Sequence, residues 1–122
     1  MNLKLSRKTF AKTVLLSALL AVSGMAAAQS KIALISHAPD SDSWWNTIKN
    51  SVKHAGEDYG VQVDYRNPPN GDLADMARLI EQAAAQGYDG VIVTIADFNV
   101  LQSSIKKLTD KKIPVITINS GT

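Results

Sequence analysis

The stretch that decides the fold is residues 72–94, which read DLADMARLIEQAAAQGYDGVIVT. Its first part spaces apolar residues three and four positions apart, which predicts an amphipathic helix, and Asp72 is suited to cap the start of that helix. Gly87 interrupts the pattern, and residues 90–94 form an apolar run without alternation, which is typical of a buried parallel strand. The predicted apolar face of the helix consists of Leu73, Met76, Ala77, Ile80, Ala83 and Ala84.

Strands and helices continue to alternate on both sides of this stretch. Upstream, residues 31–36 (KIALIS) predict a buried strand, and residues 61–65 alternate as a strand nearer the edge of a sheet. Downstream, we expect a helix over about residues 100–111 and a strand over residues 115–118. This order predicts an α/β fold, a doubly wound parallel sheet with strand order 2-1-3-4 and helices on both faces.

Another helix is predicted over residues 43–59, between the first two strands. Asp42 or Ser43 can cap its start, and Gly60 is suited to end it. Residues 67–71 (NPPNG) fit neither a helix nor a strand, so a loop is expected there. The predicted buried stripe of this helix consists of Trp45, Ile48, Val52, Ala55 and Tyr59.

The first 28 residues differ in composition from the rest and predict a cleaved secretory signal peptide. They contain four basic residues, no acidic residue and an apolar run over residues 14–22. Ala26 and Ala28 supply the small residues that a signal peptidase reads, so the mature chain is expected to begin at Gln29. A membrane anchor would need about 20 apolar residues, and serine and glycine interrupt residues 13–28. We therefore expect a soluble protein of the bacterial periplasm.

The rest of the chain lacks the features of nucleic-acid-binding proteins and of common enzymes. Residues 29–122 contain 9 basic and 11 acidic residues, which gives a net charge of −2 and no basic surface for phosphates. The absence of cysteine excludes disulfides, iron–sulfur clusters and thiolate zinc sites. No dinucleotide-binding, P-loop or hydrolase motif is present, and His37 and His54 lack the spacing of a metal-binding pair. We therefore expect no catalysis, no metal and no cofactor.

Parallel sheets of this kind bind ligands beyond the carboxyl ends of their strands, where the strand order reverses. The loops expected to meet there are residues 37–42, 95–99 and 119–122. His37 directly follows the first strand, so it is a candidate ligand-binding residue.

Two adjacent tryptophans follow the first of these loops. The C–H face of a sugar stacks on an aromatic ring, while carboxylates and amides hydrogen-bond the sugar hydroxyls. Trp44 lies off the predicted buried stripe, so we expect it to contact the ligand. Trp45 lies on that stripe, which leaves both core packing and ligand contact open for it. The sequence therefore predicts a neutral polyhydroxylated ligand.

Several segments together resemble one family of binding proteins. The chain is similar to the sugar-binding proteins of bacterial ABC importers, in the ribose-binding-protein-like branch of type I periplasmic binding proteins. The resemblance implies a sugar or polyol as ligand and an ABC permease of the inner membrane as partner. Members have two lobes, and residues 29–122 look like an incomplete amino-terminal lobe of a truncated chain. The segments are IALIS (32–36), DSWW (42–45), EDYGV (57–61), QGYDGVIVT (86–94) and KKIPVITIN (111–119).

The resemblance also implies site residues. The family's Asn-Pro-Phe-Phe segment, whose asparagine and two rings contact the sugar, falls on Asp42, Trp44 and Trp45. The family's Asp-Arg pair after the fourth strand falls on Asn119 and Ser120. This departure removes an anion and a guanidinium, so a different pentose, a hexose, a polyol or a furanose-like signal molecule is implied as readily as ribose.

Asp97 and Asn99 match the polar loop after the family's third strand. In the family this loop more often caps the following helix than contacts the ligand. Asn99 is therefore expected as the helix cap, and Asp97 is kept as a candidate ligand-binding residue.

Three other functions use the same fold. A periplasmic partner of a sensor kinase or chemoreceptor would share every feature above. A repressor of the LacI type would carry a helix-turn-helix where this chain carries its predicted signal peptide. An enzyme would need a nucleophile with a base, or a metal set, among the crevice residues, and none can be assembled from them.

Overall fold

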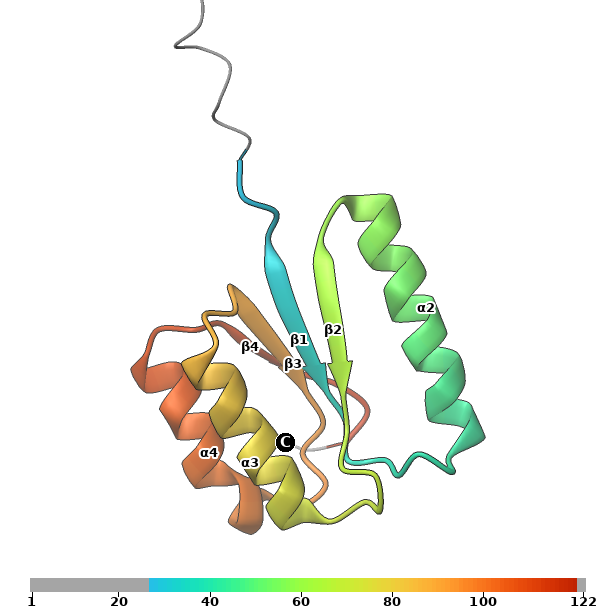
Figure 1. Ribbon diagram of the computed structural model, residues 1–122. Coiled ribbons are helices and arrows are strands. Elements are labelled where there is room, and N and C mark those ends of the chain that lie inside the picture. Colours follow the sequence, from blue (N-terminus) through green and yellow to red (C-terminus); the bar gives the residue numbers. More distant parts are fainter. Residues whose placement is uncertain (1–26, 121–122) are drawn as a thin grey trace, which may run out of the picture.

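The computed structural model describes residues 27–120 and shows one parallel sheet with helices on both faces (Figure 1). The strand order is β2-β1-β3-β4, which confirms the predicted order and fold class. All three strand pairs are parallel. The strands are β1 (Lys31–Ile35), β2 (Gln62–Arg66), β3 (Gly90–Val93) and β4 (Val115–Thr117). The helices are α2 (Ser43–Tyr59), α3 (Leu73–Ala85) and α4 (Phe98–Asp110).

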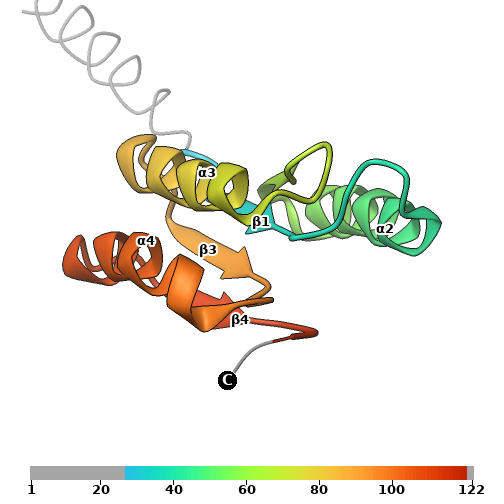
Figure 2. The same cartoon turned by 90° about the horizontal axis from the view of Figure 1, so that it is seen from below.

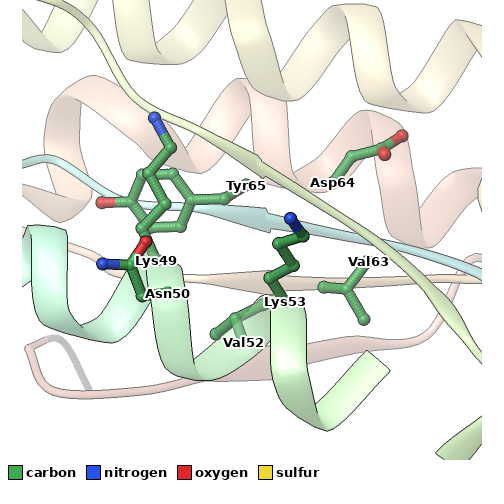
Figure 3. Close-up of a pocket in the computed structure, with 7 residues that line it drawn as sticks. All are labelled: Lys49, Asn50, Val52, Lys53, Val63, Asp64 and Tyr65. Carbon is green, nitrogen blue, oxygen red and sulfur yellow. The ribbon is translucent and has the colours of Figure 1, made fainter. Parts of the chain in front are cut away.

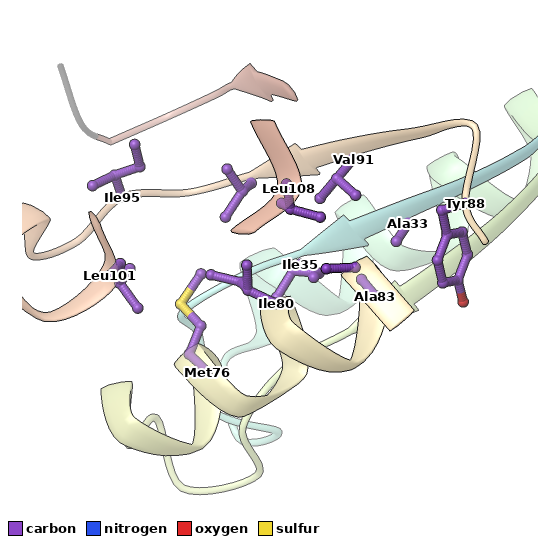
Figure 4. Close-up of a cluster of buried hydrophobic side chains, with 12 residues drawn as sticks. Ala33, Ile35, Met76, Ile80, Ala83, Tyr88, Val91, Ile95, Leu101 and Leu108 are labelled. Carbon is purple, nitrogen blue, oxygen red and sulfur yellow. The ribbon is translucent and has the colours of Figure 1, made fainter. Parts of the chain in front are cut away.

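Two separate cores hold the helices against the sheet. Figure 4 shows the larger one, in which α3 and α4 cover the face of the sheet that carries Ile35 and Val91. The smaller one lies on the opposite face, where Trp45 of α2 packs against Leu34 and Ala38. Alternate residues of β1 therefore enter different cores, as expected for a strand that is covered on both faces.

Each helix begins with an aspartate cap at the edge where the strands end, and Figure 2 looks onto this edge. The Oδ1 atom of Asp42, Asp72 or Asp97 accepts two backbone N–H hydrogens of the first helical turn. The expectation that Asn99 caps α4 is wrong. The helix begins at Phe98, because extended Asp97 accepts from the backbone N–H of Asn99 itself.

Helix α2 has the predicted bounds, but its buried stripe differs from the prediction at the carboxyl end. Trp45 is buried and Ile48 and Val52 are half-buried, whereas Ala55 is exposed and Tyr59 is 83% exposed. Gly56 is buried in their place. The chain reverses after Gly60, which has a φ of 65°, and brings the backbone of Val61 against Gly56.

Three strands end one residue earlier than predicted, at Ile35, Val93 and Thr117. The second strand begins at Gln62 and reaches Arg66, one residue later than predicted at each end. Residues 27–30 are exposed and have no regular structure, and the rest of the predicted signal peptide lies outside the described residues. Within residues 27–120, no helix combines the length and apolarity that a membrane crossing requires.

Candidate functional site

Hydrogen bonds between neighbouring chain segments continue past the ends of the strands. Ser36 N donates to Arg66 O, Thr94 N to Ile35 O, and Ile118 N to Val93 O, over 3.0 to 3.1 Å. One residue farther along, Ile95 N donates to Ser120 O over 2.8 Å. The carboxyl edge of the sheet is therefore a fixed platform for the loops that carry the predicted site.

Asn67 holds the loop that connects β1 to α2. Its Nδ2 atom donates to Ala38 O and to Asp40 Oδ1, each over 2.9 Å, and Asp40 N donates to Pro69 O. Sequence reasoning placed Asn67 in a loop but missed this role. The contacts span 27 and 29 residues, so no local pattern signals them.

Ser36 and Tyr65 form a second support beneath the same loop. The Tyr65 hydroxyl donates to Ser36 Oγ over 2.9 Å, and the backbone N–H of Ala38 donates to the same oxygen over 3.0 Å. Burial raises the pKa of Tyr65, and the carboxylates of Asp42 and Asp40 add to this effect, whereas the bond to Ser36 opposes it. Tyr65 therefore stays protonated and serves as a donor at neutral pH.

The predicted aromatic residues lie together at the start of α2. The Trp44 and Trp45 rings meet edge to face at 86°, with their centroids 5.0 Å apart. The ring of His37 meets Trp45 at 79°, with a centroid distance of 5.7 Å. Trp45 is only 5% exposed and packs in the smaller core, whereas Trp44 is 55% exposed. Trp45 thus supports the two neighbouring rings, and Trp44 offers a free face.

Asp42 and Asp97 stand at this edge, but both carboxylates also serve the fold. The Oδ1 atom of Asp42 caps α2, and the Oδ1 atom of Asp97 caps α4. Among residues 27–120, no hydrogen bond reaches the Oδ2 atom of either carboxylate. Their role as ligand-binding residues remains a prediction.

Asn119 and Ser120 follow β4, as predicted, and have two unusual features. Asn119 has a φ of 63°, in the left-handed region that few residues other than glycine adopt. The Oγ atom of Ser120 is buried and has no hydrogen-bond partner among residues 27–120. A buried hydroxyl without a partner costs about 1–3 kcal/mol, so this oxygen is suited to receive a group from outside the described residues.

The two parts of the predicted site are neighbours. Ile118, which precedes Asn119, packs against the smaller core that contains Ala38 and Trp45. The aromatic residues at the start of α2 and the polar residues after β4 therefore flank the same end of β1 and β3. Asp97 enters this edge from the third loop, at the start of α4.

Three hollows in the surface lie along the sheet, and neither Trp44 nor Asn119 lines any of the three. Figure 3 shows one of about 290 Å³ beside β2, lined by Lys49 and Lys53 of α2 and by Tyr65. Two others have mostly apolar linings and lie along the middle and the opposite end of the sheet. The predicted site lies at the carboxyl edge of one sheet. Within residues 27–120, no three His, Asp or Glu side chains cluster as metal ligands.

Comparisons with known proteins agree with this fold. A family model described as periplasmic binding protein domain matches residues 32–122. A carbohydrate transporter from Acidothermus cellulolyticus 11B, solved in complex with myo-inositol, is 33% identical with a TM-score of 0.71, and the match covers 76% of this chain and 32% of that one.

Two further solved structures are each 26% identical to this chain. For a glucose-galactose binding protein from Geobacillus stearothermophilus, the TM-score is 0.71 and the match covers 77% of this chain and 33% of that one. For a periplasmic sugar binding protein of an ABC sugar transporter from Legionella pneumophila, the TM-score is 0.72 and the coverages are 76% and 34%. This chain therefore spans about a third of the length of each structure.

Proposed function

This chain belongs to the periplasmic binding protein family, and from this membership we propose that it binds a neutral sugar or polyol for an ABC importer. The observation that carries the proposal is the half-exposed ring of Trp44, held edge-on by Trp45 at the carboxyl edge of the sheet. An exposed indole that a buried indole keeps in place is suited to stack on the C–H face of a sugar.

The polar groups around Trp44 suit the hydroxyls of such a ligand. Asp42 and Asp97 offer carboxylate oxygens as acceptors, and Asn119 offers both a donor and an acceptor in its amide. The buried Oγ atom of Ser120 gains a partner if a ligand hydroxyl reaches it. These residues supply neutral donors together with anionic acceptors, a combination that favours hydroxyl groups over anions.

Two relatives support the importer role. The Acidothermus protein is described as a carbohydrate transporter, and the Legionella protein as the sugar-binding component of an ABC transporter. By analogy, the partner of this chain is an ABC permease in the inner membrane, and residues 1–28 direct export to the periplasm. Uptake is therefore the role that we propose.

Intrinsic fluorescence can test ligand binding, because Trp44 and Trp45 are the only tryptophans in the chain. We expect myo-inositol, D-galactose or D-glucose to change the tryptophan emission of the full chain in a saturable way. Trp44→Ala should abolish this binding, as measured by calorimetry. Tyr59→Ala is the matched control, because it removes an exposed aromatic ring at the other end of the same helix.

The affinity of this chain for the sugar should be low. Micromolar binding corresponds to about −8 kcal/mol, and one side of a two-sided site supplies about half of that, which corresponds to millimolar binding. A dissociation constant tighter than about 10 μM would show that this chain alone suffices for binding. No response to any sugar of a broad pentose, hexose and polyol panel at concentrations well above millimolar would contradict the proposed function.

A further inference from the structure

One buried hydroxyl contacts His37 twice. The backbone N–H of His37 donates to Thr94 Oγ1 over 2.9 Å, and the ring Nδ1 atom of His37 lies 2.8 Å from the same oxygen. Thr94 directly follows β3 and is fully buried, and His37 lies just beyond the end of β1. The pair therefore joins the ends of the two central strands, where the strand order reverses.

The burial of Thr94 decides which atom donates the hydrogen between Oγ1 and Nδ1. The hydroxyl has one hydrogen and has no access to bulk water. If Nδ1 carried a proton and donated it, the hydroxyl hydrogen would have no acceptor within residues 27–120. A buried donor without an acceptor costs about 1–3 kcal/mol. Donation from Thr94 to an unprotonated Nδ1 satisfies both groups.

We infer that Thr94 fixes His37 as the neutral tautomer with its proton on Nε2, so that His37 presents an N–H donor to the ligand. Nε2 is the remaining polar atom of a half-exposed ring, and within residues 27–120 it has no hydrogen-bond partner. The T-shaped contact with Trp45 helps to keep the ring in place. Thr94 is thus a positioning residue and His37 a specificity-determining residue.

The inference deepens the proposed function, on which its consequence for the ligand rests. A fixed N–H donor can bond only to an acceptor on the ligand, such as a hydroxyl, ring or carbonyl oxygen. A ligand amino group in its charged form has only donors and would be rejected at this position. The fixed tautomer therefore restricts binding to ligands that have an acceptor oxygen at the position facing Nε2.

Nitrogen NMR of the imidazole rings tests the tautomer without any ligand. The chain has two histidines, and His54→Gln removes the exposed one, so the remaining signals belong to His37. In alkaline buffer, we expect a protonated Nε2 and an unprotonated Nδ1. Thr94→Val should produce a mixture of tautomers, whereas Thr94→Ser should preserve the single one. A protonated Nδ1 in the unsubstituted site, or a single Nε2–H tautomer in Thr94→Val, would overturn the inference.

Binding of myo-inositol supplies the second readout. Thr94→Val should weaken binding about tenfold, as expected for one misplaced hydrogen bond, and Thr94→Ser should retain it. Equal affinity of the Ser and Val variants would overturn the role of Thr94 in ligand selection. If the unsubstituted protein fails to bind any tested sugar, the proposed function is contradicted, while the ring spectrum still decides the tautomer.

Discussion

The hydroxyl of Tyr88 donates to Asp64 Oδ2 over 2.6 Å and so connects the segment before β3 to the middle of β2. Lys31 lies close to both, with its Nζ atom 4.4 Å from the centre of the Tyr88 ring and 3.9 Å from Asp64 Oδ2. The Tyr88 bond is the main reason that the pKa of Asp64 lies below its ordinary value of 3.8, with a further contribution from Gln62. This network ties the edge strand to the centre of the sheet.

The Tyr88 bond should make stability depend on pH in the acid range. Because the pKa of Asp64 is lowered in the folded state, its stabilising effect is complete above pH 3.8 and is lost as the pH falls through the folded pKa. Tyr88→Phe should cost about 1 kcal/mol at neutral pH, and this cost should shrink in acid. Urea unfolding at several pH values measures it, with exposed Tyr59→Phe as the control. A cost that stays constant with pH would contradict this account.

Substitution of Trp44 should affect ligand binding, whereas substitution of Ile80 should affect stability. Ile80 is fully buried in the larger core, so Ile80→Ala should lower the free energy of unfolding by about 3 kcal/mol. Trp44→Ala should leave the melting temperature nearly unchanged and abolish sugar binding. Thermal melts and titrations of both variants check this pair. Unfolding of the Trp44 variant would show that its ring belongs to the core.

Trp45 should matter for both stability and binding, and Ile48 and Val52 should matter for stability to a smaller extent than Ile80. Trp45→Ala should destabilise the fold by about 3 kcal/mol and also weaken binding, because the buried ring supports Trp44 and His37. Ile48 and Val52 are only half-buried, so their alanine variants should cost less than Ile80→Ala. Urea unfolding ranks the four variants in one experiment.

Gly56 should resist substitution, although glycine is a poor helix former. A Cβ atom at this position would lie 2.7 Å from the backbone oxygen of Val61, which cannot move without breaking the turn after α2. Gly56→Ala should therefore destabilise the protein by about 1–3 kcal/mol, in spite of the higher helix propensity of alanine. Ser51→Ala, at an exposed position of the same helix, should be neutral or slightly stabilising. Equal stabilities of the two variants would contradict the predicted clash.

The exported protein should begin at Gln29. Residues 27–30 are exposed and without regular structure, so the predicted cleavage site is accessible to a peptidase. Intact-mass measurement of a periplasmic extract checks the new amino terminus. Ala28→Asp should block cleavage and leave residues 1–28 attached in the membrane fraction. Retention of the uncleaved native chain there would contradict the signal-peptide prediction.

The sequence was sufficient for the fold because its signals are local. Asp42 and Gly60 mark both ends of α2, and unalternating apolar runs mark the central strands, so element order, strand order and family resemblance are all confirmed. The predicted start of α4 was wrong because aspartate and asparagine are both good helix caps. Only the extended backbone of Asp97 decides between Asp97 and Asn99. Helical spacing alone also could not show that α2 turns Tyr59 away from the sheet.

The site was less predictable because its supports are contacts between distant residues. Periodicity separated exposed Trp44 from buried Trp45. Periodicity could not pair His37 with Thr94, which lie 57 residues apart. It also could not show that Ser120 Oγ is buried without a hydrogen-bond partner in the described part of the chain. These contacts become visible only in the folded structure, where the ends of strands from different parts of the chain lie side by side.

The aspartate caps of the three helices have a consequence for phosphorylated metabolites. The start of a helix normally attracts phosphate, because its free N–H groups and dipole favour negative charge. Here Asp42, Asp72 and Asp97 already place a carboxylate on each of these starts, all at the edge where the ligand would bind. A sugar phosphate beside Trp44 would therefore meet the negative charges of Asp42 and Asp97, and the protein should bind a free sugar more tightly than its phosphorylated form.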